Sequence, residues 1–173
     1  MPGEVIATLV VELVAGLLAH VGAEAAQAKG RTWLDRRDFD KLEDDAKQAF
    51  IAGLVFVASY DGALSPAELD EMDTRLRQLE IEQNGRDVAL AVAAREEVAA
   101  AIGSDDAEYA SRLVARIPEG RPREALLRVS VAVALHGDVE RQLAAVRRLG
   151  KAMGLKDDEM EATLNAERSR LIR

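Results

Sequence analysis

The sequence predicts an all-α protein, a bundle of about seven or eight helices with two central buried helices related by an internal pseudo-twofold duplication. Alanine, leucine, glutamate and arginine dominate the composition, and aromatic residues make up only 3%, which favours helices over strands. Residues 50–60 and 125–137 are apolar with almost no polar interruption. A helix that is hydrophobic on every face must be surrounded by other helices.

The two apolar stretches resemble each other, which indicates the duplication. The second lies 75 positions after the first (126 − 51), and each ends at a glycine. The matched pairs are Ile51 and Leu126, Leu54 and Val129, Phe56 and Val131, Ala58 and Val133, and Gly62 and Gly137.

The chain divides into an N-terminal amphipathic helix with its connector, residues 1–40, and a helical domain, residues 41–173. The first helix is expected over residues 4–28, and its apolar stripe either covers the bundle or pairs with a second copy in a homodimer. Glu4 and Glu12 argue against a signal peptide, a membrane span and an interfacial membrane helix. In the connector, Trp33, Leu34 and Phe39 are expected to be anchors that pack into the bundle.

Local sequence signals predict where the helices of residues 41–173 begin and end. The first apolar helix runs to about Tyr60, and Ser65-Pro66-Ala67-Glu68 is a capping box with proline at the first position of the next helix. Further helices are expected over residues 87–102, 105–117 and 123–135, with residues 118–122 as a loop. The last two follow residue 138 and residue 157, separated by Gly154.

Charge and composition exclude several classes of function. A net charge of −8 argues against binding to duplex nucleic acid, and the basic residues Arg147, Arg148 and Lys151 are interpreted as an ordinary solvated helix face. The chain has no cysteine, which excludes disulfides and thiolate chemistry and favours the cytoplasm. No phosphate loop, zinc-protease motif or nucleophile elbow is present, so no catalytic residue is assigned and we expect no enzyme.

Asp61 is the residue with the strongest case for a ligand. It follows the end of an apolar helix, where the helix dipole disfavours an anion, so a cation, a basic side chain or a turn hydrogen bond should offset its charge. Carboxylates and free carbonyls are the ligands that Ca²⁺ and Mg²⁺ prefer. The alternatives are an Asx turn at Asp61 and a purely capping role for Glu68.

The segment ASYDGALSPAELDEM resembles the TerB tellurite-resistance family, in which a buried helix leads through an Asp-Gly turn into a capped helix. The later segment LLRVSVAVALHGDVERQLAAVRRLGKAMGLKDDEM is similar to the second repeat of that family, and the resemblance covers residues 47–164. The second repeat is degenerate, because His136 stands where the family has aspartate.

The resemblance implies a bacterial, cytoplasmic protein of the tellurite and stress response that is not an enzyme. It also implies protein partners in a resistance complex near the inner membrane, and a divalent cation, Ca²⁺ or Mg²⁺, held by acidic residues of the two turns. The corresponding positions here are Asp61 and Glu68 in the first repeat and Asp138 and Glu140 in the second. Two alternatives remain open: a metal-free structural or regulatory interaction domain, and an enzyme with an unrecognised helical active site.

Overall fold

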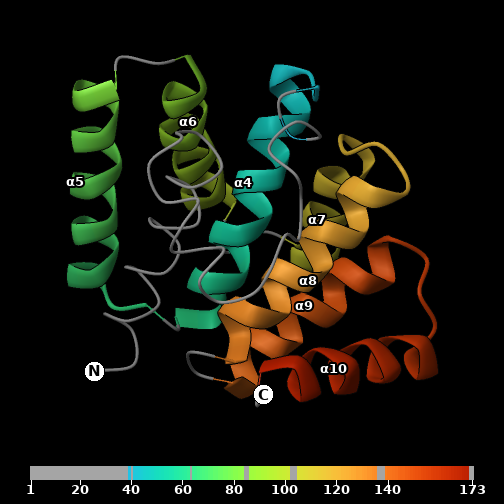
Figure 1. Cartoon of the computed structure of the whole chain (residues 1–173). Helices are drawn as coiled ribbons and strands as arrows, with labels where there is room; N and C mark the ends of the chain where they lie inside the picture. Colours follow the sequence, from blue (N-terminus) through green and yellow to red (C-terminus); the bar gives the residue numbers. More distant parts are fainter. Residues whose placement is uncertain are drawn as a thin grey trace.

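The structure is a computed structural model that describes residues 39, 41–62, 64–83, 86–101, 105–135 and 139–171. This part of the chain forms seven α-helices, one 3₁₀ helix and no strand, as the sequence predicts for an all-α protein (Figure 1). The elements are α4 (Asp44–Ser59), η1 (Tyr60–Gly62), α5 (Pro66–Gln83), α6 (Arg86–Ala101), α7 (Asp106–Ala115), α8 (Arg121–Leu135), α9 (Val139–Ala152) and α10 (Asp157–Leu171). The expected helix over residues 4–28 and the anchors Trp33 and Leu34 lie outside the described residues.

Helix α4 packs against α6, α7, α8 and α9, most extensively against α6, while α5 packs on α6. Helix α10 runs along the base of α8 and α9 in the view of Figure 1. Residues 49–59 of α4 are all buried, and so are residues 125–134 of α8 except the exposed Arg128. The described parts of the two apolar stretches therefore lie mostly in helices whose side chains are largely buried, as their composition predicts.

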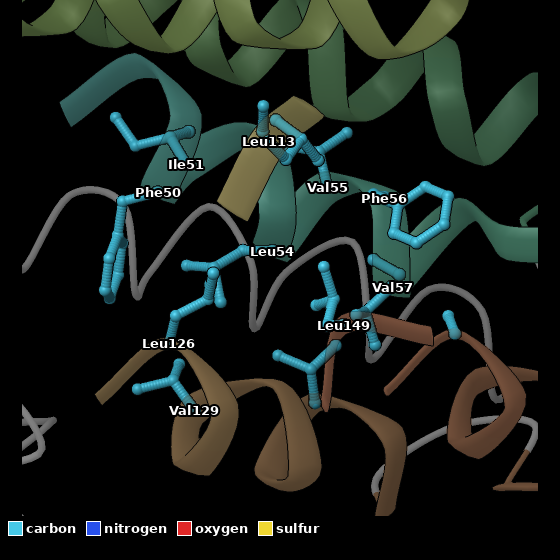
Figure 2. Packing of buried hydrophobic residues seen from close by; sticks show 14 of the residues in the cluster. Phe50, Ile51, Leu54, Val55, Phe56, Val57, Leu113, Leu126, Val129 and Leu149 are labelled. Carbon is cyan, nitrogen blue, oxygen red and sulfur yellow. The ribbon is translucent and has the colours of Figure 1, made fainter. Parts of the chain in front are cut away.

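Helices α4 and α8 come very close at Gly53. A β-carbon there would lie 2.9 Å from Cδ1 of Leu126, which is completely buried. Figure 2 shows Leu54 of α4 beside Leu126 and Val129 of α8 in this part of the core. A second close approach joins α9 to α10, where a β-carbon at Gly150 would collide with Sδ of Met160. A β-carbon at either position would require the side chain that it meets to shift within the packed core.

The described residue of the connector, Phe39, confirms the prediction of an anchor. Its side chain is fully buried, and its ring stands edge-on to Phe50 with 6.0 Å between centroids. The ammonium group of Lys47 lies 5.5 Å from the centroid of the Phe39 ring. Phe39 is thus fixed to α4 by an aromatic contact and a cation–π contact.

Several helix ends follow the predicted signals, whereas the starts of α4, which has Glu43 at its N-cap position, and of α8 differ from the prediction. Asp105 accepts hydrogen bonds from the backbone N–H groups of Ala107 and Glu108 and so caps α7, and Gly154 ends α9 with φ of +85°. Helix α8 begins at Arg121, so the expected loop over residues 118–122 is too long. Pro122 lies in the first turn, where its missing N–H group breaks no helical hydrogen bond.

Candidate functional site at the end of α4

The candidate site is the C-terminal end of α4, where the chain turns through η1. Gly62 has φ of +73°, a conformation that glycine adopts readily and that reverses the chain after the Asp-Gly pair. The side chain of Gln142, on α9, donates a hydrogen bond of 2.9 Å from Nε2 to the carbonyl oxygen of Ala58. This bond satisfies one of the carbonyl groups that a helix end leaves without a partner. Oε1 of the fully buried Gln142 has no hydrogen-bond partner in the described part of the chain.

A basic side chain lies next to this helix end. Nε of Arg148, on α9, donates to the hydroxyl oxygen of Tyr60 over 2.8 Å. The hydrogen bond with Tyr60 raises the pKa of Arg148 above its usual value, so this group stays a cation. A cation at the C-terminus of a helix interacts favourably with the helix dipole. Arg148 is therefore a basic group of the kind expected near Asp61, which follows Tyr60 directly in the chain.

The predicted metal ligands are placed only in part. The backbone of Asp61 lies in η1, whereas the side chain of Asp61 and all of His136 and Asp138 lie outside the described residues. Glu140 is exposed in the first turn of α9. Where the structure describes side chains, it brings no three histidines or acids together in a group that could hold a metal ion. The set of Asp61, Glu68, Asp138 and Glu140 stays a prediction.

Glu68 has a structural role that the sequence predicts. Oε2 of Glu68 accepts the N–H of Ser65 over 2.6 Å, and Oγ of Ser65 accepts the N–H of Glu68 over 3.3 Å. These two bonds form the reciprocal capping box at the start of α5. The carboxylate of Glu68 is therefore already engaged, with one oxygen bound to the backbone.

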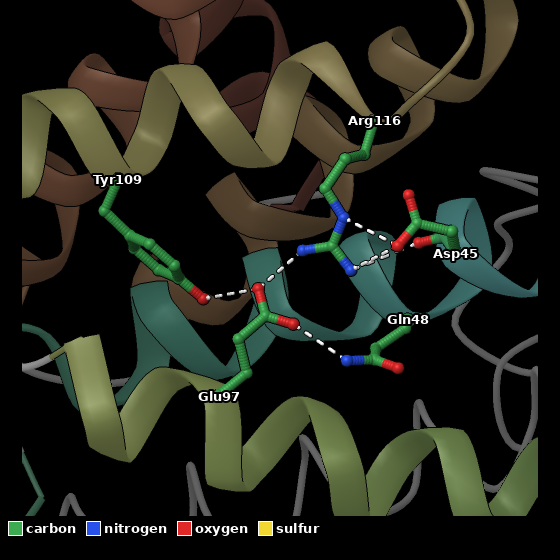
Figure 3. A network of polar contacts seen from close by, with 5 residues as sticks. All are labelled: Asp45, Gln48, Glu97, Tyr109 and Arg116. Atoms are coloured by element: carbon green, nitrogen blue, oxygen red, sulfur yellow. Dashed lines mark hydrogen bonds and ion pairs between the residues drawn. The ribbon is translucent and has the colours of Figure 1, made fainter.

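A polar network that sequence reasoning missed joins α4, α6 and α7 (Figure 3). Its hub is Glu97, whose Oε1 accepts Nη1 of Arg116 over 2.6 Å and the hydroxyl of Tyr109 over 3.2 Å. Its other oxygen accepts Nε2 of Gln48 over 2.9 Å. Arg116 continues to α4, where its Nε donates to Oδ1 of Asp45 over 3.0 Å.

The electrostatics of this network indicate a structural role. Burial, and after it the carboxylate of Glu97, raises the pKa of Tyr109, so the phenol stays neutral. Burial opposes the charge of Arg116, but its hydrogen bonds to Glu97 and Asp45 leave its pKa raised. A charged guanidinium and a neutral phenol that both donate to the carboxylate of Glu97 hold α4, α6 and α7 together.

Two basic residues of α9 contact neighbouring groups. Arg147 pairs with Glu161 of α10 at 3.1 Å, and Arg148 binds Tyr60 as described above. Lys151 is exposed in the last turn of α9. These contacts favour the interpretation of a solvated helix face that helps to hold α10 and η1.

Comparison with known proteins finds no relative: no protein-family model matches the chain, and no curated protein and no solved structure is significantly similar to it. Within the described ranges, the structure has no helix with the length and apolar character needed to cross a membrane.

Proposed function

We propose that this protein is a TerB-like component of the stress response or of tellurite resistance, and that it works as a non-enzymatic helical interaction module. The observation that carries the proposal is the succession of α4, η1 and α5. A helix buried throughout residues 49–59 leads through an Asp-Gly turn into a helix opened by a Ser65–Glu68 capping box. This is the arrangement on which the resemblance to the TerB family depends.

The proposal includes an internal duplication that relates α4 to α8. Its support is that the first three matched pairs are buried on both sides: Ile51 and Leu126, Leu54 and Val129, and Phe56 and Val131. The two helices also pack directly against each other at Gly53 and Leu126. Each half would then supply one interior helix to the shared core.

We further propose that the turn after α4 binds Ca²⁺ or Mg²⁺ through Asp61, with Glu68, Asp138 and Glu140 as the other acidic candidates. Support comes from the chemistry of the helix end, because carboxylate and carbonyl oxygens are the ligands these cations prefer. Buried Gln142 adds one more oxygen, Oε1, without a partner among the described residues.

Two observations favour a metal-free interaction domain as the second candidate. The carboxylate of Glu68 is bound to the backbone of Ser65, and Arg148 already provides a cation beside Tyr60. When a nearby cation such as Arg148 offsets the negative end of the helix dipole, no bound metal ion is needed there.

Calorimetric titration of the protein with Ca²⁺ and with Mg²⁺ separates the two candidates. The metal-binding form predicts uptake by the wild type and at least about tenfold weaker binding by Asp61→Ala, because a charged ligand is lost. Asp70→Ala, at an exposed position on α5, is the matched control and should bind like the wild type. If the wild type takes up neither ion, the cation proposal fails and the metal-free domain stands.

The proposed role and the proposed partners have separate tests. Expression in a tellurite-sensitive bacterium should raise the tellurite concentration that permits growth, and an unchanged limit would refute the role in resistance. Pairing through the N-terminal helix predicts a dimer in sedimentation that becomes a monomer when residues 1–30 are removed. An unchanged mass after the deletion would reject this homodimer.

A further inference from the structure

A small pocket lies between α5 and α6, away from the end of α4. Its volume is about 80 Å³. Its lining mixes two arginines and two carboxylates with three apolar side chains: Asp73, Leu76 and Arg77 from α5, and Val92, Arg95, Glu96 and Ala99 from α6. A space of this size exceeds the ~10–15 Å³ that one water molecule needs and is far below the ~300 Å³ of a drug-sized site.

Arg95 is the unusual residue of this pocket, because it is only 9% exposed and carries a full charge. Its Nε lies 3.0 Å from Oδ1 of Asp73 but forms no hydrogen bond, so the two groups are an ion pair with poor alignment. In the part of the chain that the structure describes, Asp73 is its sole ionic partner. A guanidinium has five N–H donors, and leaving buried donors unpaired is costly.

The neighbouring charges only partly compensate Arg95. Burial raises the pKa of Asp73 despite the opposing charges of Arg95 and Arg77, so the ionised carboxylate is poorly solvated at this position. Arg77 is exposed at the rim and adds a second guanidinium. Glu96 is also exposed, so solvent screens its repulsion of an incoming anion.

We propose that this pocket binds a small oxyanion of the carboxylate or phosphate type. The donors of Arg95 would bind it from inside the pocket, and Arg77 would bind it from the rim. Planar guanidinium groups match the oxygens of carboxylates and phosphates, often through two parallel hydrogen bonds. Leu76, Val92 and Ala99 limit the space to an ion of that size. The site is independent of the function proposed above.

The test is calorimetric titration of the full chain with inorganic phosphate, sulfate and acetate, which also shows whether tetrahedral oxyanions or carboxylates are preferred. Arg77→Gln should weaken binding about tenfold, because one charge-assisted contact is lost. Asp73→Asn should strengthen binding several-fold, because it removes the competing negative charge and keeps the shape of the side chain. Arg147→Gln, an exposed change on α9, is the matched control and should bind like the wild type.

Circular dichroism establishes that each variant is folded before titration. The opposite effects of Arg77→Gln and Asp73→Asn are the result expected of an anion in this pocket. If the wild type binds none of the three ions, the proposal is overturned. It is also overturned if the three variants bind with the same affinity, since the ion then sits elsewhere.

Discussion

The contact between Gly53 and Leu126 predicts a coupled effect of substitutions in α4 and α8. Gly53→Ala adds a methyl group whose carbon would lie 2.9 Å and 3.1 Å from the two Cδ atoms of Leu126. Leu126 is completely buried, so its side chain cannot move toward solvent. The added methyl group must therefore shift the side chain of Leu126 within the packed core.

The magnitudes follow from the two opposing effects of each change. Alanine improves helix propensity by ~1 kcal/mol, whereas overpacking costs ~1–3 kcal/mol, so Gly53→Ala should destabilise the fold by ~1 kcal/mol. Leu126→Ala alone should cost ~2–5 kcal/mol, because it leaves a cavity. In the double variant the new methyl group occupies part of that cavity. The loss should therefore be smaller than the sum of the single losses by ~1–2 kcal/mol.

Equilibrium unfolding in urea measures the free energies of the four proteins in this cycle. Leu127→Ala is the matched control, because Leu127 is buried on the same helix but packs toward Gly150 of α9, where its Cδ1 lies 3.8 Å from the position that a β-carbon would take. Its effect should add to that of Gly53→Ala within ~0.5 kcal/mol. Additivity of Gly53→Ala and Leu126→Ala within the same limit would refute the close packing of α4 on α8.

Three further predictions concern the network and the cap. Glu97→Gln should lower the unfolding free energy by ~1–2 kcal/mol, because it removes the charge of the carboxylate that accepts from Arg116. The same change at the exposed Glu96 is the control and should cost less than ~0.5 kcal/mol. Equal losses in the two variants would contradict a stabilising role of the network. The raised pKa of Tyr109 means that folding favours the neutral phenol, so its contribution is complete below about pH 10 and is lost as the pH rises through the folded-state pKa. Urea unfolding from pH 8 to pH 11 should therefore show a steeper loss for the wild type than for Tyr109→Phe, and parallel curves would count against this explanation. Ser65→Ala removes the hydroxyl of the capping box and should cost ~1 kcal/mol in the same assay, and an unchanged stability would show that the cap contributes nothing.

Local signals were sufficient to predict most of the helices that the structure describes. The Ser65–Glu68 capping box and the Asp105 cap act over three residues or fewer, so they can be read directly from the chain. The burial of residues 49–59 of α4 and of most of residues 125–134 of α8 follows from composition, because these stretches contain few polar side chains.

The polar network could not be predicted, because its partners are distant in sequence. Arg116 lies 71 residues from Asp45 and 19 from Glu97, and their meeting depends on how three helices rotate about their axes. The burial of Tyr109 on the apolar side of α7 is a signal for the position of that helix, but it does not identify Glu97 as the partner. The same limit applies to Arg95 and Asp73, since either could have faced solvent on an isolated helix.

The close approach of α9 and α10 at Gly150 has a consequence for chemical damage by oxidants. Met160 is 4% exposed, and its sulfur atom has no space for even one methyl group on the side of Gly150. Burial limits access of peroxide to the sulfur, so we expect Met160 to be oxidised slowly while α10 is packed on α9. The sulfoxide adds a polar oxygen to this packed contact and should therefore weaken the packing of α10 on α9.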